Sequence, residues 1–178
     1  MRKFLNIALA AAELSGNLVK EFYNKVNDIK NKNKNYRDLV SEVDIVSENA
    51  IIKTIKSKFK KHNFLGEELG YENNNSNYTW IIDPLDGTVN YTRGISLCVI
   101  AISLKFKNKT ILGVIYNPFL NELYYSIQNN PVYFNGLKKN LSKNLDIKNC
   151  LMISALSSDT DKNISKNFTT FRKLNNQS

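Results

Sequence analysis

The sequence predicts an α+β domain in which two long helices pack against a mainly antiparallel sheet. Apolar residues recur at the three- and four-residue spacing of a helix face through residues 2–30 and again through residues 43–59. Between residues 63 and 136, short apolar runs alternate with turn residues, which is typical of strands joined by tight connections. This order predicts a meander of strands beneath two helices.

The elements are expected in a simple order along the chain. The amphipathic first helix should be followed by a charged loop over residues 31–37 and by a second helix that Ser41 caps. Residues 71–78 are rich in Asn and lack periodicity, so we expect an exposed loop there. A last helix is expected around residues 164–174. The expected strands lie at residues 63–65, 80–82, 97–104, 111–116, 122–127, 131–134 and 151–155.

Length and composition favour a globular protein with one domain over residues 1–178. Hydrophobic residues make up 42% of the 178 residues, which is enough to bury a core. The formal net charge of +9 comes mainly from lysines that are scattered along the chain. A nucleic-acid-binding protein would more often concentrate basic residues on one element, so we expect the charge to attract anionic substrates instead.

The N-terminal segment has some features of a signal peptide, because Met1-Arg2-Lys3 precedes an apolar stretch. The apolar pattern continues with helical spacing beyond that stretch, which is also too short to cross a bilayer. Cys98 and Cys150 lie far apart in apolar runs, and we interpret them as free thiols in a reducing compartment. We therefore expect a cytoplasmic protein.

Residues 80–91 contain the strongest functional signal. Trp-Ile-Ile at residues 80–82 predicts a buried strand, which Asp83 ends and Pro84 stops. Asp83 and Asp86 would leave this strand together, and like charges that lie so close share either a proton or a cation. Thr88 is expected to cap a helix whose first N–H groups suit a phosphate. The pattern indicates a metal-dependent phosphate site, and the alternative is a turn with solvated Asp side chains.

Two upstream acidic segments are uninformative when each is taken alone. Asp44 follows Ser41 by three residues, and an acidic residue in the first turn of a helix offsets the helix dipole. Gly66-Glu67-Glu68 follows the strand at residues 63–65 and by itself is typical of a solvated acidic turn.

Three motifs in this order resemble those of the inositol monophosphatase family. They are Asp-Leu-Val-Ser-Glu-Val-Asp at residues 38–44, Gly-Glu-Glu at residues 66–68, and Asp-Pro-Leu-Asp-Gly-Thr at residues 83–88 with Trp-Ile-Ile before it and Asn90-Tyr91 after it. The resemblance implies a layered α/β sandwich of the inositol monophosphatase/fructose bisphosphatase type. It also implies a phosphoric monoester hydrolase that uses Mg²⁺.

The resemblance implies particular metal ligands. Glu67, Asp83 and the backbone carbonyl of Leu85 would hold a first Mg²⁺, and Asp83 and Asp86 would reach a second. Only oxygen ligands are involved, which suits this ion.

The resemblance also implies the remaining site residues. Asp44 and Thr88 would orient and activate the attacking water, and Glu68 would lie just outside the metal ligands. The N–H groups of Gly87 and Thr88 would bind phosphate oxygens.

Residues 88–91, Thr-Val-Asn-Tyr, resemble the branch of the family that acts on small polyols, so myo-inositol monophosphate is the expected substrate. The family implies a homodimer for the intact protein, and nothing suggests a membrane partner. The alternatives are a non-catalytic fragment and an RNA-associated binding protein.

The resemblance covers only the N-terminal portion of the family. A second α/β half with a Trp-Asp motif is expected after this portion, and no such motif occurs here. Either the chain is a fragment, which we favour, or it is a reduced protein. In both cases the first metal site should form, the second should be weakened, and turnover should be impaired.

Overall fold

The computed structural model describes residues 1–30, 36–140, 146, 169 and 171–173. It divides into two compact units, residues 1–140 and residues 141–178. In the second unit, residues 169 and 171–173 are helical, in agreement with the helix expected around residues 164–174. The remaining positions of that helix, the strand expected at residues 151–155 and Cys150 lie outside the described residues.

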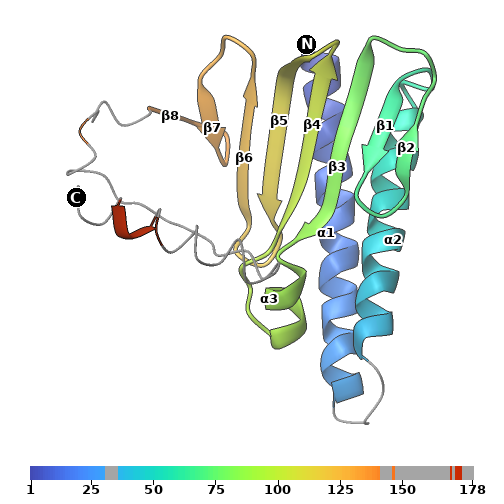
Figure 1. Ribbon diagram of the computed structural model, residues 1–178, viewed down its shortest axis with the longest axis vertical. Helices are drawn as coiled ribbons and strands as arrows, with labels where there is room; N and C mark the ends of the chain where they lie inside the picture. Colours follow the sequence, from blue (N-terminus) through green and yellow to red (C-terminus); the bar gives the residue numbers. More distant parts are fainter. Residues whose placement is uncertain (31–35, 141–145, 147–168, 170, 174–178) are drawn as a thin grey trace. The chain divides into compact units, whose positions relative to one another are not determined.

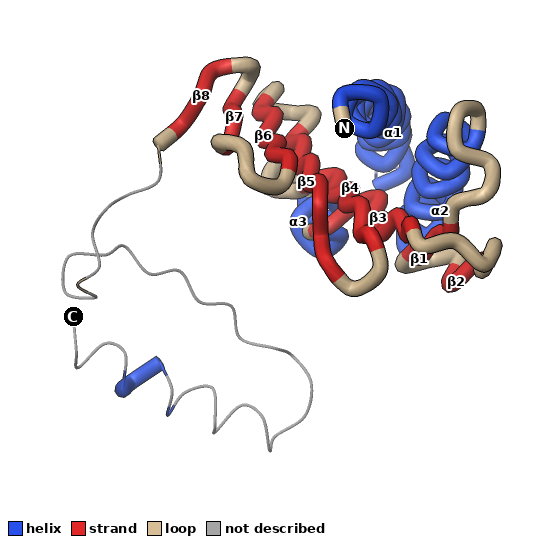
Figure 2. The backbone as a smooth tube through the Cα atoms, turned by 90° about the horizontal axis from the view of Figure 1, so that it is seen from above, coloured by secondary structure: helices blue, strands red, loops and turns tan. Residues whose placement is uncertain are grey.

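Two long helices form one layer of the first unit. Helix α1 spans Arg2–Lys30 as expected, and helix α2 spans Tyr36–Lys56. They pack side by side and cover one face of the sheet (Figures 1 and 2). Small residues allow this close approach: the Oγ atoms of Ser15 and Ser47 lie 2.5 Å apart in the buried interface. No helix in the described ranges is long and apolar enough to cross a membrane.

The second layer is one eight-stranded sheet with the order β2-β1-β3-β4-β5-β6-β7-β8. Its pairs are antiparallel except for β1 and β3, which run parallel (Figure 1). The predicted α+β architecture with a mainly antiparallel sheet is therefore confirmed. The strands are β1 (Asn63–Gly66), β2 (Gly70–Glu72), β3 (Tyr78–Asp86), β4 (Val99–Phe106), β5 (Lys109–Asn117), β6 (Glu122–Ile127), β7 (Val132–Phe134) and β8 (Leu137–Lys139).

The core lies between the helices and the covered face of the sheet. In β4, Ile100, Ile102 and Leu104 are buried and alternate with partly exposed residues, as expected for a strand with one covered face. Trp80 of β3 is fully buried. Cys98 is a buried free thiol, as the sequence predicted.

Several element boundaries differ from the sequence prediction. The expected loop over residues 71–78 contains strand β2 at its start, because backbone pairing with β1 stabilises exposed residues that show no apolar alternation. Strand β4 begins at Val99 rather than residue 97, because its pairing with β3 begins where Val99 lies opposite Asp86. The Asn-Gly turn at residues 135–136 leads into the additional short strand β8.

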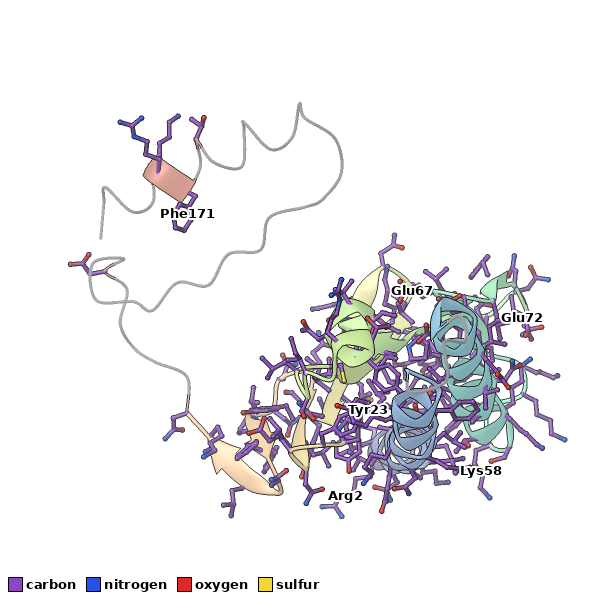
Figure 3. The ribbon with its side chains drawn as sticks, turned by 90° about the horizontal axis from the view of Figure 1, so that it is seen from below. Arg2, Tyr23, Lys58, Glu67, Glu72 and Phe171 are labelled. Carbon is purple, nitrogen blue, oxygen red and sulfur yellow. The ribbon has the colours of Figure 1, made fainter. Side chains whose placement is uncertain are left out.

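The short helix α3, Thr88–Arg93, is fastened to α1 by one buried side chain. Tyr91 donates a hydrogen bond from its hydroxyl group to the carbonyl of Val19, at 2.9 Å. Its ring also lies 5.3 Å from the ring of Tyr23, which Figure 3 labels. Tyr91 therefore fixes the segment that directly follows β3.

Replacing Tyr91 with Phe should lower the free energy of unfolding by about 1 kcal/mol, because the hydroxyl group makes a buried hydrogen bond. Urea denaturation measures this loss. The control is Tyr71→Phe in β2, where the side chain is exposed and the change should have little effect. Equal stability of Tyr91→Phe and the unmodified protein would contradict the anchoring role.

Candidate active site

Helix α2 contributes two buried acidic residues to one end of β1 and β3. Asp44 is 6% exposed and Glu48 is fully buried, one helical turn further along. Residues separated by four positions lie on the same face of a helix. Both carboxyl groups therefore approach the sheet from the same side.

The position of Asp44 within α2 corrects the sequence prediction. We expected Ser41 as the N-cap, but α2 already begins at Tyr36, so Asp44 lies more than two turns inside the helix. The five residues from Tyr36 to Val40 include neither Gly nor Pro, and the helix continues through them. An interaction with the helix dipole in the first turn thus does not explain Asp44.

The parallel pairing of β1 with β3 brings Glu67 close to Asp83. Gly66 is the last residue of β1 and lies opposite Ile82. The residues that follow them, Glu67 and Asp83, therefore lie next to each other. The N–H group of Glu67 continues the pairing by donating to the carbonyl of Ile82 at 3.2 Å. Figure 3 shows this end of the unit, with Glu67 labelled.

Strand β3 does not end at Asp83 as predicted. It continues to Asp86, and its register with β4 shifts between Asp83 and Asp86, where Pro84 lies. A bulge accommodates a proline inside a sheet because no ladder hydrogen bond is needed there. Asp83 accepts a hydrogen bond from the N–H group of Leu85 at 3.1 Å, which holds the irregular segment in place.

Asp44, Glu67 and Asp83, which we call the acidic triad, influence one another strongly. Burial, together with the charges of Glu68, Glu67, Asp83 and Glu48, raises the pKa of Asp44 from 3.8 to about 7. Burial also raises the pKa of Asp83 to about 7, and the charge of Glu67 and a side-chain hydrogen bond with it add to this effect. Within the described part of the chain, the charges that shift the pKa of Asp44 all come from carboxylates.

Asp44 has a buried acceptor without a partner. Its Oδ1 atom is shielded from solvent and makes no hydrogen bond within the described part of the protein. Buried polar atoms are nearly always satisfied, so such an atom needs an explanation. A bound cation or an ordered water would satisfy it.

The donor atoms suit a hard divalent cation such as Mg²⁺, because carboxylate and carbonyl oxygens are the ligands it prefers. Asp86 lies close enough to Asp83 to raise its pKa, so it belongs to the same acidic region. Glu68 is exposed and acts on Asp44 more strongly than the other acids do. Among the described residues, no three acidic, His or Cys side chains are gathered closely enough to form a complete metal site.

The segment after Asp86 differs in detail from the prediction. Gly87, rather than Thr88, is the N-cap of α3, and no side chain caps this helix. Thr88 instead donates its hydroxyl hydrogen to the carbonyl of Leu85 at 3.0 Å, because Thr88 already lies in the first turn. Gly87 has a φ angle of 93°, and a β-carbon there would lie 2.8 Å from the carbonyl oxygen of Leu97.

The sequence analysis missed Glu48. Both of its carboxyl oxygens accept backbone hydrogen bonds, from Glu68 at 2.9 Å and from Leu69 at 3.1 Å. The available signal was an acidic residue inside the apolar face of a helix, between Val43 and Ile51. Such a residue must find partners in the folded protein.

Comparison with known proteins identifies the family, because residues 1–178 match the inositol monophosphatase family. The chain belongs to this family. It is 33% identical over 174 residues to the fructose-1,6-bisphosphatase/inositol-1-monophosphatase of Aquifex aeolicus. That alignment covers 98% of this chain and 66% of the Aquifex protein. It is also 33% identical over 148 residues to the Nus factor SuhB of Pasteurella multocida, over 83% of this chain and 55% of that protein.

Solved structures of the inositol monophosphatase family support the same fold. The inositol monophosphatase of Anabaena superposes with a TM-score of 0.83 and 27% identity over 99% of this chain and 64% of that chain. The SuhB protein of Bartonella henselae gives a TM-score of 0.72 and 28% identity over 83% of this chain and 58% of that chain. The predicted fold type is confirmed. The chain spans between about half and two thirds of the length of these relatives.

Replacing Asp44 with Asn should stabilise the metal-free protein at pH 8. The folded state keeps the Asp44 proton up to about pH 7, whereas the unfolded chain releases it near pH 3.8. Stability should therefore fall as the pH rises through this window. The asparagine side chain of the variant does not ionise, so the stability of the variant does not fall in this way. Without the buried unpaired carboxylate, its free energy of unfolding at pH 8 should exceed that of the unmodified protein by about 1–3 kcal/mol.

This gain is measured by urea denaturation in the presence of a chelator at pH 4 and pH 8. The two proteins should be nearly equal at pH 4. Glu72→Gln is the control, because Glu72 is exposed and pairs with Lys56, so its removal should give no gain at pH 8. A less stable Asp44→Asn variant at pH 8 would show that the carboxyl group is satisfied in another way.

Proposed function

We propose that the protein hydrolyses a small phosphate monoester with the help of Mg²⁺. One observation carries this proposal: the acidic triad comes from three separate segments, and the charges of the described residues that raise the pKa of Asp44 are all carboxylates. Burial of interacting carboxylates without a cation opposes folding, so the arrangement is expected to serve a ligand. Membership of the inositol monophosphatase family supports the same activity.

The residues that would hold Mg²⁺ are the oxygen donors that the family motifs imply. Glu67, Asp83 and the carbonyl of Leu85 would bind one ion, and Asp83 with Asp86 would bind a second. When bound, the metal lowers the pKa of a water ligand and neutralises charge on the phosphate.

Two side chains of the protein would handle the attacking water. The hydroxyl hydrogen of Thr88 is used by the carbonyl of Leu85, so the lone pairs of Thr88 Oγ1 are left to accept a hydrogen bond from that water. The Oδ1 of Asp44, which has no partner among the described residues, is a second acceptor for this water. Together they would orient the water for attack in line with the leaving group.

The remaining groups concern the substrate. We propose that the N–H groups of Gly87 and Thr88 contact the phosphate, as the family motif implies. A cavity of about 390 Å³ is lined by Asp86 and Gly87, and its lining also includes the polar side chains of Asn90 and Glu122. These groups suit the hydroxyls of a polyol, so myo-inositol monophosphate is our first choice of substrate.

The direct test is Mg²⁺-dependent release of phosphate from myo-inositol monophosphate. Asp83→Asn and Glu67→Gln should each reduce the rate at least 100-fold, because each removes a metal ligand. Glu72→Gln is the matched control for the second change and should retain the full rate, since Glu72 lies at the exposed edge strand β2. Equal rates in Asp83→Asn and the unmodified protein would refute the mechanism.

A second candidate function is RNA-associated binding without catalysis. The net charge of +9 and the similarity to a protein named Nus factor SuhB favour it. Binding to RNA should then weaken steeply with salt and should be unchanged in Asp83→Asn. A protein that releases phosphate and shows no salt-dependent RNA binding would exclude this candidate.

A further inference from the structure

Glu48 connects α2 to the turn that carries Glu67. Its side chain is fully buried, and each of its carboxyl oxygens accepts one backbone hydrogen bond, from Glu68 and from Leu69. Hydrogen bonds of this kind between a carboxyl group and backbone N–H groups are strong and directional. The turn after β1 is therefore fastened to the helix at two neighbouring peptide groups.

Gly66 provides the space for this contact. A β-carbon at this position would overlap the carboxyl group of Glu48. Gly66 has no positive φ angle, so the backbone conformation alone does not require glycine. The glycine is needed because the Glu48 carboxyl group lies directly against the backbone of β1.

Glu67 is consequently held from two sides. On one side its N–H group donates to Ile82, the residue before Asp83. On the other side the next two N–H groups are bound by Glu48, which lies one helical turn after Asp44. The two contacts fix Glu67 relative to both other members of the acidic triad.

We propose that Glu48 is a positioning residue, which holds the Glu67 turn beside Asp83 so that the acidic triad can bind a divalent cation. The proposal rests on the function proposed above. Glu48 itself is not assigned as a ligand, because its fully buried carboxyl group lies against the backbone of Gly66 and accepts from the N–H groups of Glu68 and Leu69. Its effect on metal binding should therefore pass through Glu67.

The test measures Mg²⁺ binding to the full chain by calorimetry. Glu48→Ala removes both hydrogen bonds and should weaken binding at least 10-fold. Glu48→Gln keeps one acceptor oxygen, so it should fold even where Glu48→Ala does not, and it should give a smaller loss in the same direction. In a Glu67→Gln background, Glu48→Gln should have almost no further effect, because coupled residues give non-additive losses.

A second measurement separates positioning from general stability. Amide hydrogen exchange at Glu68 and Leu69 should be at least 10-fold faster in Glu48→Gln, while exchange in β3 and β4 stays slow. Ile51→Val is the control, because Ile51 is a fully buried residue of α2 whose truncation weakens the core without touching the turn. It should leave exchange at Glu68 and Leu69, and the affinity for Mg²⁺, close to those of the unmodified protein.

The outcomes are distinguishable. If the unmodified protein does not bind Mg²⁺, the proposed function fails, and the positioning role falls with it. If it binds Mg²⁺ and Glu48→Gln binds equally well, only the positioning role is overturned. Additive losses in the double variant, or an equal loss in Ile51→Val, would likewise overturn the role of Glu48 and leave the proposed function standing.

Discussion

The structure depends on keeping negatively charged groups together where they repel one another. Asp44 and Asp83 come from a helix and a strand, and the pKa of each rises to about 7 because burial and neighbouring carboxyl groups disfavour the charged form. A shift of this kind means that the folded state is less stable at neutral pH than it would be without these groups. The fold must therefore supply other interactions that hold the acidic triad in place.

Those interactions come from the backbone more than from the side chains of the triad. Parallel pairing of β1 with β3 sets Glu67 beside Asp83, and the bulge in β3 turns the segment after Asp83 toward α3. Glu48 fastens the turn after β1 to α2, and Tyr91 fastens α3 to α1. The Glu48 contact joins the end of β1 to α2, and the Tyr91 contact joins α3, which follows β3, to α1. The site is thus held between rigid elements.

Much of this arrangement could be predicted from the sequence, since periodicity and turn residues revealed α1, the strands β4 to β7 and the apolar strand at Trp80. The missed features depend on tertiary contacts. Strand β2 has no buried side chain and exists because β1 offers it backbone partners, and β3 passes Pro84 because a bulge removes the need for its hydrogen bond. The sequence could place acidic residues in order, but the parallel register that brings them together, and the two amides that Glu48 binds, required the structure.

The surroundings of Asp44 differ from those of a buried acidic residue that has only a structural role. Replacing buried charged groups with apolar residues of similar size is often neutral or stabilising, so selection for stability alone gives no reason to keep Asp44 inside the domain. Structural ion pairs place opposite charges together. Among the described residues, however, the charges that raise the pKa of Asp44 are all carboxylates, and none of these residues donates a hydrogen bond to its Oδ1 atom. Proteins break such rules mainly where function requires it. A cation that compensates the acidic triad would turn this unfavourable arrangement into a favourable one, which is why the acidic triad supports a metal-dependent activity more strongly than its sequence motifs do.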